Sequence, residues 1–340
     1  MGNYNKNNKS DSKMHNIEIN INNCYITSSL QTFLHLEDFI TDVRSINIKN
    51  KKENMKLTSE FRDLIDDYLI KKHILIKLNP IKIKKVLSEV NEKYQTNHQR
   101  DANEFITFFL NQMMDEVKGI GIKNIKKIDP PTDEKGKTAF EKLEENFFYK
   151  NQSFLTDLFY GRLKKEILCP KDHVIKVSFE VYNMIQLPNI DNKERNNEQE
   201  YSIEEYLKKF QEKRSIQDII ECSECHNSDI YFSKTTIYNL PNYIILLLNN
   251  QFIKYNDKFT IEVKQFIESE KNSEEQYELV GVISYYGNYK RGHYYSKCKL
   301  FNQDKWINYD KTEQSFLEMN PKYDAILFYQ KVKTNESHNE

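Results

Sequence analysis

Residues 20–34 read NINNCYITSSLQTFL, and Cys24 stands where this polar stretch turns into a helical pattern. After it the apolar residues Ile26, Leu30 and Phe33 recur at helical spacing. A cysteine at a helix start meets backbone N–H groups and a helix dipole that stabilise a thiolate. A lone cysteine is more often a small buried core residue. The pattern therefore indicates a nucleophile only if the rest of the chain supplies a base.

A histidine and an acid in the C-terminal part complete such a set. The sequence RGHYYS places His293 at the start of a strand directly after a Gly-bearing loop, and WINYD places Asp310 on the following strand. Adjacent antiparallel strands can set His293 beside Asp310, whose carboxylate then fixes the tautomer of the imidazole. Together with Cys24 they form the cysteine–histidine–acid arrangement that activates a thiol.

The order of the elements indicates an α+β protein. Helical patterns dominate the first 115 residues, and strand-like runs dominate the chain beyond Phe154. The expected helices cover residues 24–34, 57–72, 80–90 and 101–113, with a short one at 202–210. The expected C-terminal strands cover residues 243–248, 277–284, 293–300 and 325–331. Capping signals precede three of the helices, as Asn79 with Pro80, Asp101 with Glu104, and Ser202 with Glu205.

The bulk properties exclude several classes of protein. With 50 basic and 51 acidic residues among 340, the chain lacks the basic excess of a nucleic-acid-binding protein. It has no run of about 18 apolar residues, so no membrane span is expected. The five cysteines are an odd count in a long chain, which favours catalytic or metal-binding thiols in a reducing, intracellular compartment, cytoplasmic or nuclear. Residues 1–16 and 333–340 are expected to be flexible tails.

An ordered set of motifs resembles the ubiquitin-specific proteases. Residues 21–31 are similar to the cysteine box of that family, and His293 and Asp310 fall in what resembles its histidine box. Further similar segments, in family order, are QRDANEF at 99–105, LFYG at 158–161, LP at 240–241 with the apolar run to Leu248, and AILFY at 325–329.

The resemblance implies a papain-like hand within residues 17–332. A helical thumb covers about 17–150, β fingers about 155–235 and a β-rich palm about 236–332. It implies a monomeric deubiquitinase that acts on ubiquitin and ubiquitinated proteins and needs no cofactor for the chemistry. The alternatives are an isopeptidase for a ubiquitin-like modifier and an inactive ubiquitin-binding module.

Several positions depart from the family pattern. Ile21 stands where the family has Gly, Thr27 where it has Asn, Tyr285 where it has His, and Lys311 where it has a second acid. The family donates to the oxyanion with an Asn before the cysteine. Asn20 takes that place if the segment is one residue shorter, whereas Asn22 matches the middle of the motif. Both can equally be read as turn residues.

The remaining thiols suggest a zinc site. Cys222 and Cys225 have the C-x2-C spacing of a zinc knuckle. The resemblance implies an upstream half-site in the fingers. Cys169 is the thiol there, and His173 or Asp172 would supply the fourth ligand. Cys169, His173, Cys222 and Cys225 would form a Cys3His structural site, and the alternative is a knuckle that has lost its metal.

Overall fold

The computed structural model describes most of the chain, in thirteen segments. They are residues 21–48, 54–70, 80–121, 128–189, 201–216, 221–226, 230–248, 253–254, 258–263, 273–288, 291–301, 305–309 and 324–333. Asn20, Asp310 and nearly all of both expected tails lie outside these residues. Within the described part, no helix has the length and apolar character needed to cross a membrane.

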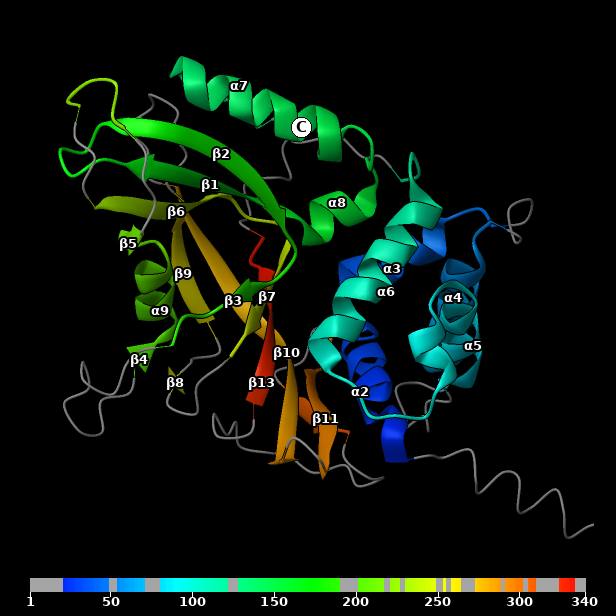
Figure 1. Ribbon diagram of the computed structural model, residues 1–340. Coiled ribbons are helices and arrows are strands. Elements are labelled where there is room, and N and C mark those ends of the chain that lie inside the picture. The colour runs from blue at the N-terminus through cyan, green and yellow to red at the C-terminus, as the bar shows by residue number, and fades with distance from the viewer. Residues whose placement is uncertain are drawn as a thin grey trace, which may run out of the picture.

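A group of helices forms the first lobe, which we call the thumb. It consists of η1 (Ile21–Asn23), α2 (Cys24–Phe33), α3 (Glu37–Ser45), α4 (Lys56–Ile70), α5 (Ile81–Val90), η2 (Glu92–Gln95) and α6 (Ala102–Val117). The expected helices are therefore confirmed, and α3 is an addition. Figure 1 shows these helices together beside the sheets.

The second lobe, the palm, is a sheet with the strand order β12-β11-β10-β13-β7-β3, to which β9 adds by pairing with β10. Its strands are β3 (Ile185–Gln186), β7 (Tyr243–Leu247), β9 (Lys258–Val263), β10 (Ser273–Asn288), β11 (Arg291–Lys299), β12 (Trp306–Asn308) and β13 (Asp324–Lys331). Side chains alternate across it with the period of two expected of strands. Ile326 and Phe328 pack in the thumb core, whereas Leu327 and Tyr329 pack on the opposite face.

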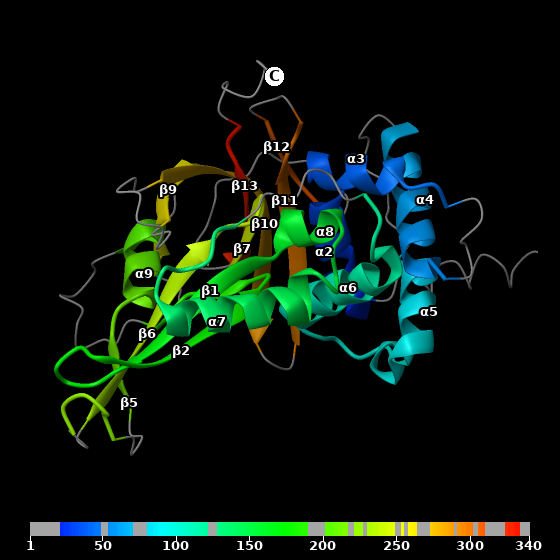
Figure 2. The same ribbon diagram turned by 90° about the horizontal axis from the view of Figure 1, so that it is seen from above.

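The fingers are a separate sheet with the order β2-β1-β6-β5. Its strands are β1 (Gly161–Leu168), β2 (Val174–Tyr182), β5 (Arg214–Ile216) and β6 (Tyr231–Asn239). Figure 2 shows them running outward from the palm and the thumb. Helix α9 (Ile203–Phe210) packs against the palm, and β4 (Tyr201–Ser202) and β8 (Ile253–Lys254) form a short parallel pair.

A helical connection that the sequence did not predict joins the thumb to the fingers. It consists of α7 (Glu134–Leu143), the π-helical turn η3 (Glu144–Phe148) and α8 (Phe154–Phe159). Helix α7 lies along β2 (Figure 1), and its Phe140 packs against Phe179 and Tyr238. In η3, Glu144 accepts two hydrogen bonds from buried Arg162, 2.5 and 2.8 Å long.

Helix α2 is held in the thumb core by aromatic packing. The Phe33 ring is fully buried and stacks on Phe109 of α6 at 5.2 Å. It also contacts Phe328 of β13 edge-on at 6.1 Å. Because Phe33 sits at the end of the helix that Cys24 begins, this packing fixes the axis along which the cysteine is presented.

The three capping predictions have different outcomes. Ser202 and Glu205 form the predicted capping box of α9. Asp101 caps α6, but its carboxylate accepts from the N–H of Asn103, without a reciprocal bond from Glu104. Pro80 takes the cap position of α5 itself, so the first-turn assignment was wrong by one residue, and Asn79 lies outside the described residues.

Candidate active site

Cys24 is the first residue of α2, directly after η1, and 9% of it is exposed. Hydrogen bonds from the backbone of Tyr294, Tyr25 and Cys24 itself reach its sulfur. Burial raises the pKa of the Cys24 thiol above its ordinary value, and these hydrogen bonds act in the opposite direction. Because the net shift is upward, forming the thiolate at neutral pH needs a nearby base.

His293 lies on the palm strand that meets this thiol. It pairs with Tyr286 in the β10–β11 register, and the two rings are 5.4 Å apart in an edge-on arrangement. The next residue along β11 is Tyr294, whose backbone reaches the Cys24 sulfur. The structure therefore brings the predicted histidine strand to the predicted nucleophile.

The strand that leads to the predicted acid also lies beside β11. Asn308 pairs with Lys297, and the N–H of Tyr309 donates to the carbonyl of Ser296 at 2.8 Å. Asp310 follows Tyr309 but lies outside the described residues, so its role stays a prediction.

The two candidate oxyanion donors are placed differently. Asn22 is a half-buried residue of η1, two positions before Cys24. Asn20 lies outside the described residues. The neighbouring Asn23 is already engaged, since its Oδ1 accepts a hydrogen bond from the Lys84 ammonium at 3.1 Å.

Gln99 is the residue of this site to which sequence reasoning gave no role. Its Nε2 donates to the carbonyl oxygen of Gly292 at 2.6 Å and lies 3.9 Å from the Cys24 sulfur. Its Oε1 accepts from the N–H of Gly292 at 3.4 Å. The motif around Gln99 was visible in the sequence, but its partner is 193 residues away and no local pattern announces it.

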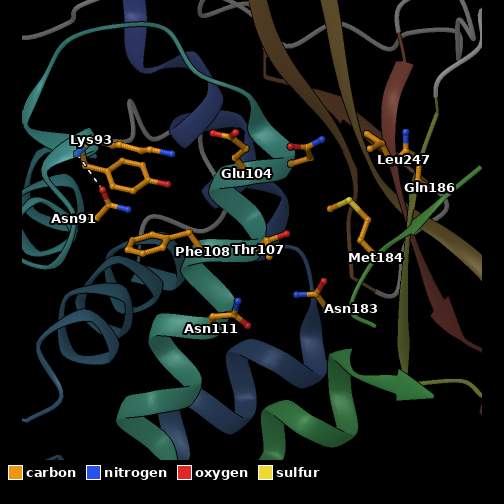
Figure 3. Close-up of a pocket in the computed structure, with 12 residues that line it drawn as sticks. Asn91, Lys93, Glu104, Thr107, Phe108, Asn111, Asn183, Met184, Gln186 and Leu247 are labelled. Atoms are coloured by element: carbon orange, nitrogen blue, oxygen red, sulfur yellow. Dashed lines mark hydrogen bonds between the residues drawn. The ribbon is translucent and has the colours of Figure 1, made fainter. Parts of the chain in front are cut away.

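A groove of about 570 Å³ runs between the thumb and the palm. One wall is α6, with Glu104, Thr107 and Phe108, and the opposite wall carries Met184 and Leu247 (Figure 3). The first turn of α6 is tied to β11, because the Tyr294 hydroxyl donates to Asp101 at 3.3 Å. The same helix therefore borders the groove and starts beside the candidate site.

The four predicted metal ligands meet at the tip of the fingers. The ligand atoms of Cys169, His173, Cys222 and Cys225 all lie within 4.8 Å of one another. The alternative ligand Asp172 is turned away and pairs with Lys213. Burial acts to raise the pKa of Cys222, but hydrogen bonds from the backbone of Cys225 and Glu224 and from His173 lower it to about 6.

Two of the separations between these ligand atoms match those around a tetrahedral zinc ion. Two thiolates bound at about 2.3 Å lie about 3.8 Å apart, and a thiolate and an imidazole nitrogen lie about 3.6 Å apart. The Cys169 and Cys225 sulfurs are 3.7 Å apart, and the Cys222 sulfur is 3.7 Å from Nδ1 of His173.

Comparisons with known proteins agree with this geometry. The chain is 23% identical over 368 residues to ubiquitin carboxyl-terminal hydrolase 4 of Saccharomyces cerevisiae, covering 92% of this chain and 38% of that protein. It is 22% identical over 334 residues to ubiquitin carboxyl-terminal hydrolase Usp2 of Drosophila melanogaster, covering 92% and 34%. The chain thus spans well under half the length of these relatives.

Two solved structures share the fold. One is a SAGA DUB module of Ubp8, Sgf11, Sus1 and Sgf73 bound to monoubiquitin, with a TM-score of 0.67 and 18% identity over 92% of this chain and 68% of that chain. The other is that module bound to ubiquitin aldehyde, with a TM-score of 0.66, 18% identity and the same coverage. The predicted α+β class and papain-like hand are confirmed. The family described as ubiquitin carboxyl-terminal hydrolase matches residues 16–329, and the chain belongs to this family.

Proposed function

We propose that this protein is a thiol-dependent deubiquitinase that cleaves the bond after the C-terminal glycine of ubiquitin. One observation carries the proposal. The buried Cys24 sulfur receives hydrogen bonds from the thumb backbone and from the backbone of Tyr294 in the palm, the residue that follows His293. Family membership supports ubiquitin as the substrate, as do the similar solved structures that are bound to monoubiquitin or ubiquitin aldehyde.

The chemistry follows from these groups. His293 takes the thiol proton, and the Cys24 thiolate attacks the carbonyl carbon of the last glycine, which places a negative charge on its oxygen. The resulting imidazolium gives the proton to the departing lysine amine as the C–N bond breaks and the thioester forms. A water molecule, deprotonated by His293, then attacks the thioester and releases the glycine carboxylate and the free thiol. Asp310 is the proposed carboxylate that orients the imidazole through these steps.

The groove between α6 and the palm is the proposed path of the ubiquitin tail. It is open, it has polar and apolar walls, and it is bordered by the helix that starts beside Cys24. A chain end lying there would be extended, with its backbone able to bond to side chains such as Asn103 and Glu104. We propose that the fingers hold the globular body of ubiquitin.

We also propose a structural zinc ion in the fingers, held by Cys169, His173, Cys222 and Cys225. The distances between their ligand atoms support it. The ion would join the β1–β2 hairpin to the loop before β6 and take no part in the chemistry. All five cysteines are free thiols in the structure, which supports an intracellular site of action.

The decisive experiment offers the protein a panel of C-terminal electrophile probes, made from ubiquitin and from ubiquitin-like modifiers. A covalent adduct on Cys24 with the ubiquitin probe supports the proposal. An adduct only with another modifier supports the alternative isopeptidase. Noncovalent binding of ubiquitin without any adduct would point to an inactive binding module.

A further inference from the structure

We propose that Gln99 is a positioning residue, whose carboxamide clasps the backbone of Gly292 and so holds His293 at the Cys24 thiol. This rests on the roles proposed above for Cys24 and His293. The additional element is Gln99, a thumb residue that contacts both the nucleophile and the residue before its base.

The clasp is a two-point pairing between one side chain and one residue of backbone. Gln99 Nε2 donates to the Gly292 carbonyl at 2.6 Å, and Gln99 Oε1 accepts from the Gly292 N–H at 3.4 Å. The amide imitates the edge of a neighbouring strand. A flipped amide would face N–H with NH2 and carbonyl with carbonyl, so these two backbone groups fix its orientation.

The fixed orientation decides what Gln99 presents to the sulfur. Since Nε2 must face the Gly292 carbonyl, its second hydrogen remains for Cys24, whose sulfur lies 3.9 Å away. The amide can therefore donate to the thiolate, and this contact lowers the pKa of Cys24. One side chain thus touches the nucleophile and the residue preceding its base.

Gly292 is suited to being held from two sides. An added Cβ there would lie 1.9 Å from the Tyr285 hydroxyl oxygen, so a larger residue would displace the Tyr285 ring. Gly292 also lies at the turn end of the β10–β11 hairpin, where the last pairs are Gly287 with Gly292 and Asn288 with Arg291. A tie to Gly292 fixes the start of β11 relative to the thumb, one residue before His293.

The segment that carries Gln99 is itself anchored. Arg100 donates from Nε to the carbonyl of Lys93 at 3.1 Å and from Nη2 to the Thr96 hydroxyl at 3.3 Å. Asp101 caps α6 and accepts from the Tyr294 hydroxyl. Because these contacts hold the segment in place, the hydrogen bonds of Gln99 fix the position of β11 relative to the thumb.

The test compares Gln99→Leu and Gln99→Glu with a matched control. Leu keeps the approximate length and removes both hydrogen bonds, whereas Glu keeps the acceptor for the Gly292 N–H but repels both the Gly292 carbonyl and a thiolate. The control is Gln95→Leu, because the Gln95 amide donates to the carbonyl of Ser88 on the exposed surface. The rate of Cys24 alkylation by iodoacetamide is followed against pH by peptide mass spectrometry, and hydrolysis of a ubiquitin C-terminal reporter is measured alongside.

The expected result is a shift of the alkylation profile toward higher pH in Gln99→Leu and a larger shift in Gln99→Glu. We expect kcat to fall by roughly 10- to 100-fold, as for the loss of a hydrogen bond to a charged group, with KM within about twofold. The melting temperature should match that of Gln95→Leu.

The proposal would be overturned if the alkylation profile did not shift and kcat stayed near that of the unaltered protein. An unshifted profile with a change in KM alone would overturn it as well. The alkylation arm needs no ubiquitin. If the unaltered protein does not cleave the reporter while the profile still shifts, the clasp stands and only the ubiquitin assignment falls.

Discussion

The backbone of Tyr294 donates a hydrogen bond to the sulfur of Cys24, although Tyr294 belongs to the palm and Cys24 opens a thumb helix. The thiol is therefore shared between two lobes, and its ionisation depends on how closely they meet. The same interface holds the Gln99 clasp and the contact between Tyr294 and Asp101. A small separation of the lobes would remove several stabilising donors at once.

The oxyanion prediction separates two nearby asparagines. Cys24 supplies one donor through its backbone N–H. Asn20 is the favoured second donor, because it takes the place of the family's oxyanion Asn if the segment before the cysteine is one residue shorter. Losing such a donor typically lowers kcat by roughly 10²–10³. We expect this loss in Asn20→Ala, and a change of a few-fold at most in Asn22→Ala, from steady-state kinetics with a ubiquitin reporter. Small and equal effects in both variants would assign the oxyanion to other groups.

The metal prediction concerns the tip of the fingers. The purified protein should contain about one equivalent of zinc, as expected of a four-ligand structural site. Cys222→Ser should lose the metal, lower the melting temperature and weaken ubiquitin binding more than it lowers kcat. Cys298→Ala is the control, because Cys298 is buried elsewhere and should leave the zinc content unchanged. A metal-free protein with an unaltered melting temperature would instead establish a knuckle without metal.

The next prediction concerns stability at alkaline pH and the thiol of Cys298, which is fully buried beneath α2. Burial raises the pKa of Cys298 to about 12, from an ordinary value of 9.0. The folded state therefore favours the neutral thiol, and this contribution to stability is complete below about pH 9 and is lost as the pH rises toward 12. Urea unfolding at pH 8 and at pH 10.5 should show a smaller decline in the free energy of unfolding for Cys298→Ala than for the unaltered protein. Equal declines would contradict the assignment.

The stability prediction concerns a buried histidine behind the active site. The hydroxyls of Tyr68 and Tyr309 lie 2.8 and 3.0 Å from Nε2 of His35, whose Nδ1 lies 2.8 Å from the carbonyl of Gln31. His35→Phe removes the nitrogen that both hydroxyls share, and we expect it to lower the free energy of unfolding by about 1–3 kcal/mol.

His226→Phe is the control for this change, since 75% of its side chain is exposed. The free energies of unfolding in urea provide the comparison. Equal values for the two variants would show that the His35 contacts add nothing to stability.

Features with a local pattern were predictable from the sequence. The helix after Cys24 and the strand of His293 follow from apolar spacing and from the glycines before the strand. The metal ligands follow from the C-x2-C spacing and the resemblance. His173 was the preferred fourth ligand from the sequence, and the structure groups it with the three cysteines while Asp172 pairs with Lys213.

Features that depend on tertiary contacts were missed. Helix α7 has one short apolar row around Phe140, which packs on the fingers, and it carries Gly136 in its first turn, a residue that disfavours helices. In the structure Asp133 caps that turn by accepting from the Gly136 N–H at 2.6 Å. The contacts of Gln99 with Gly292 and of Lys84 with Asn23 join segments far apart in the chain, so no local pattern reports them.

The central claim is that Cys24 is the nucleophile of a deubiquitinase, and the most direct measurement is hydrolysis of a ubiquitin C-terminal reporter by Cys24→Ala. The account predicts no detectable turnover, with ubiquitin affinity and melting temperature close to those of the unaltered protein, because only the attacking sulfur is removed. Cys298→Ala, which removes a buried thiol outside the site, should retain turnover. Near-normal hydrolysis by Cys24→Ala would contradict the account.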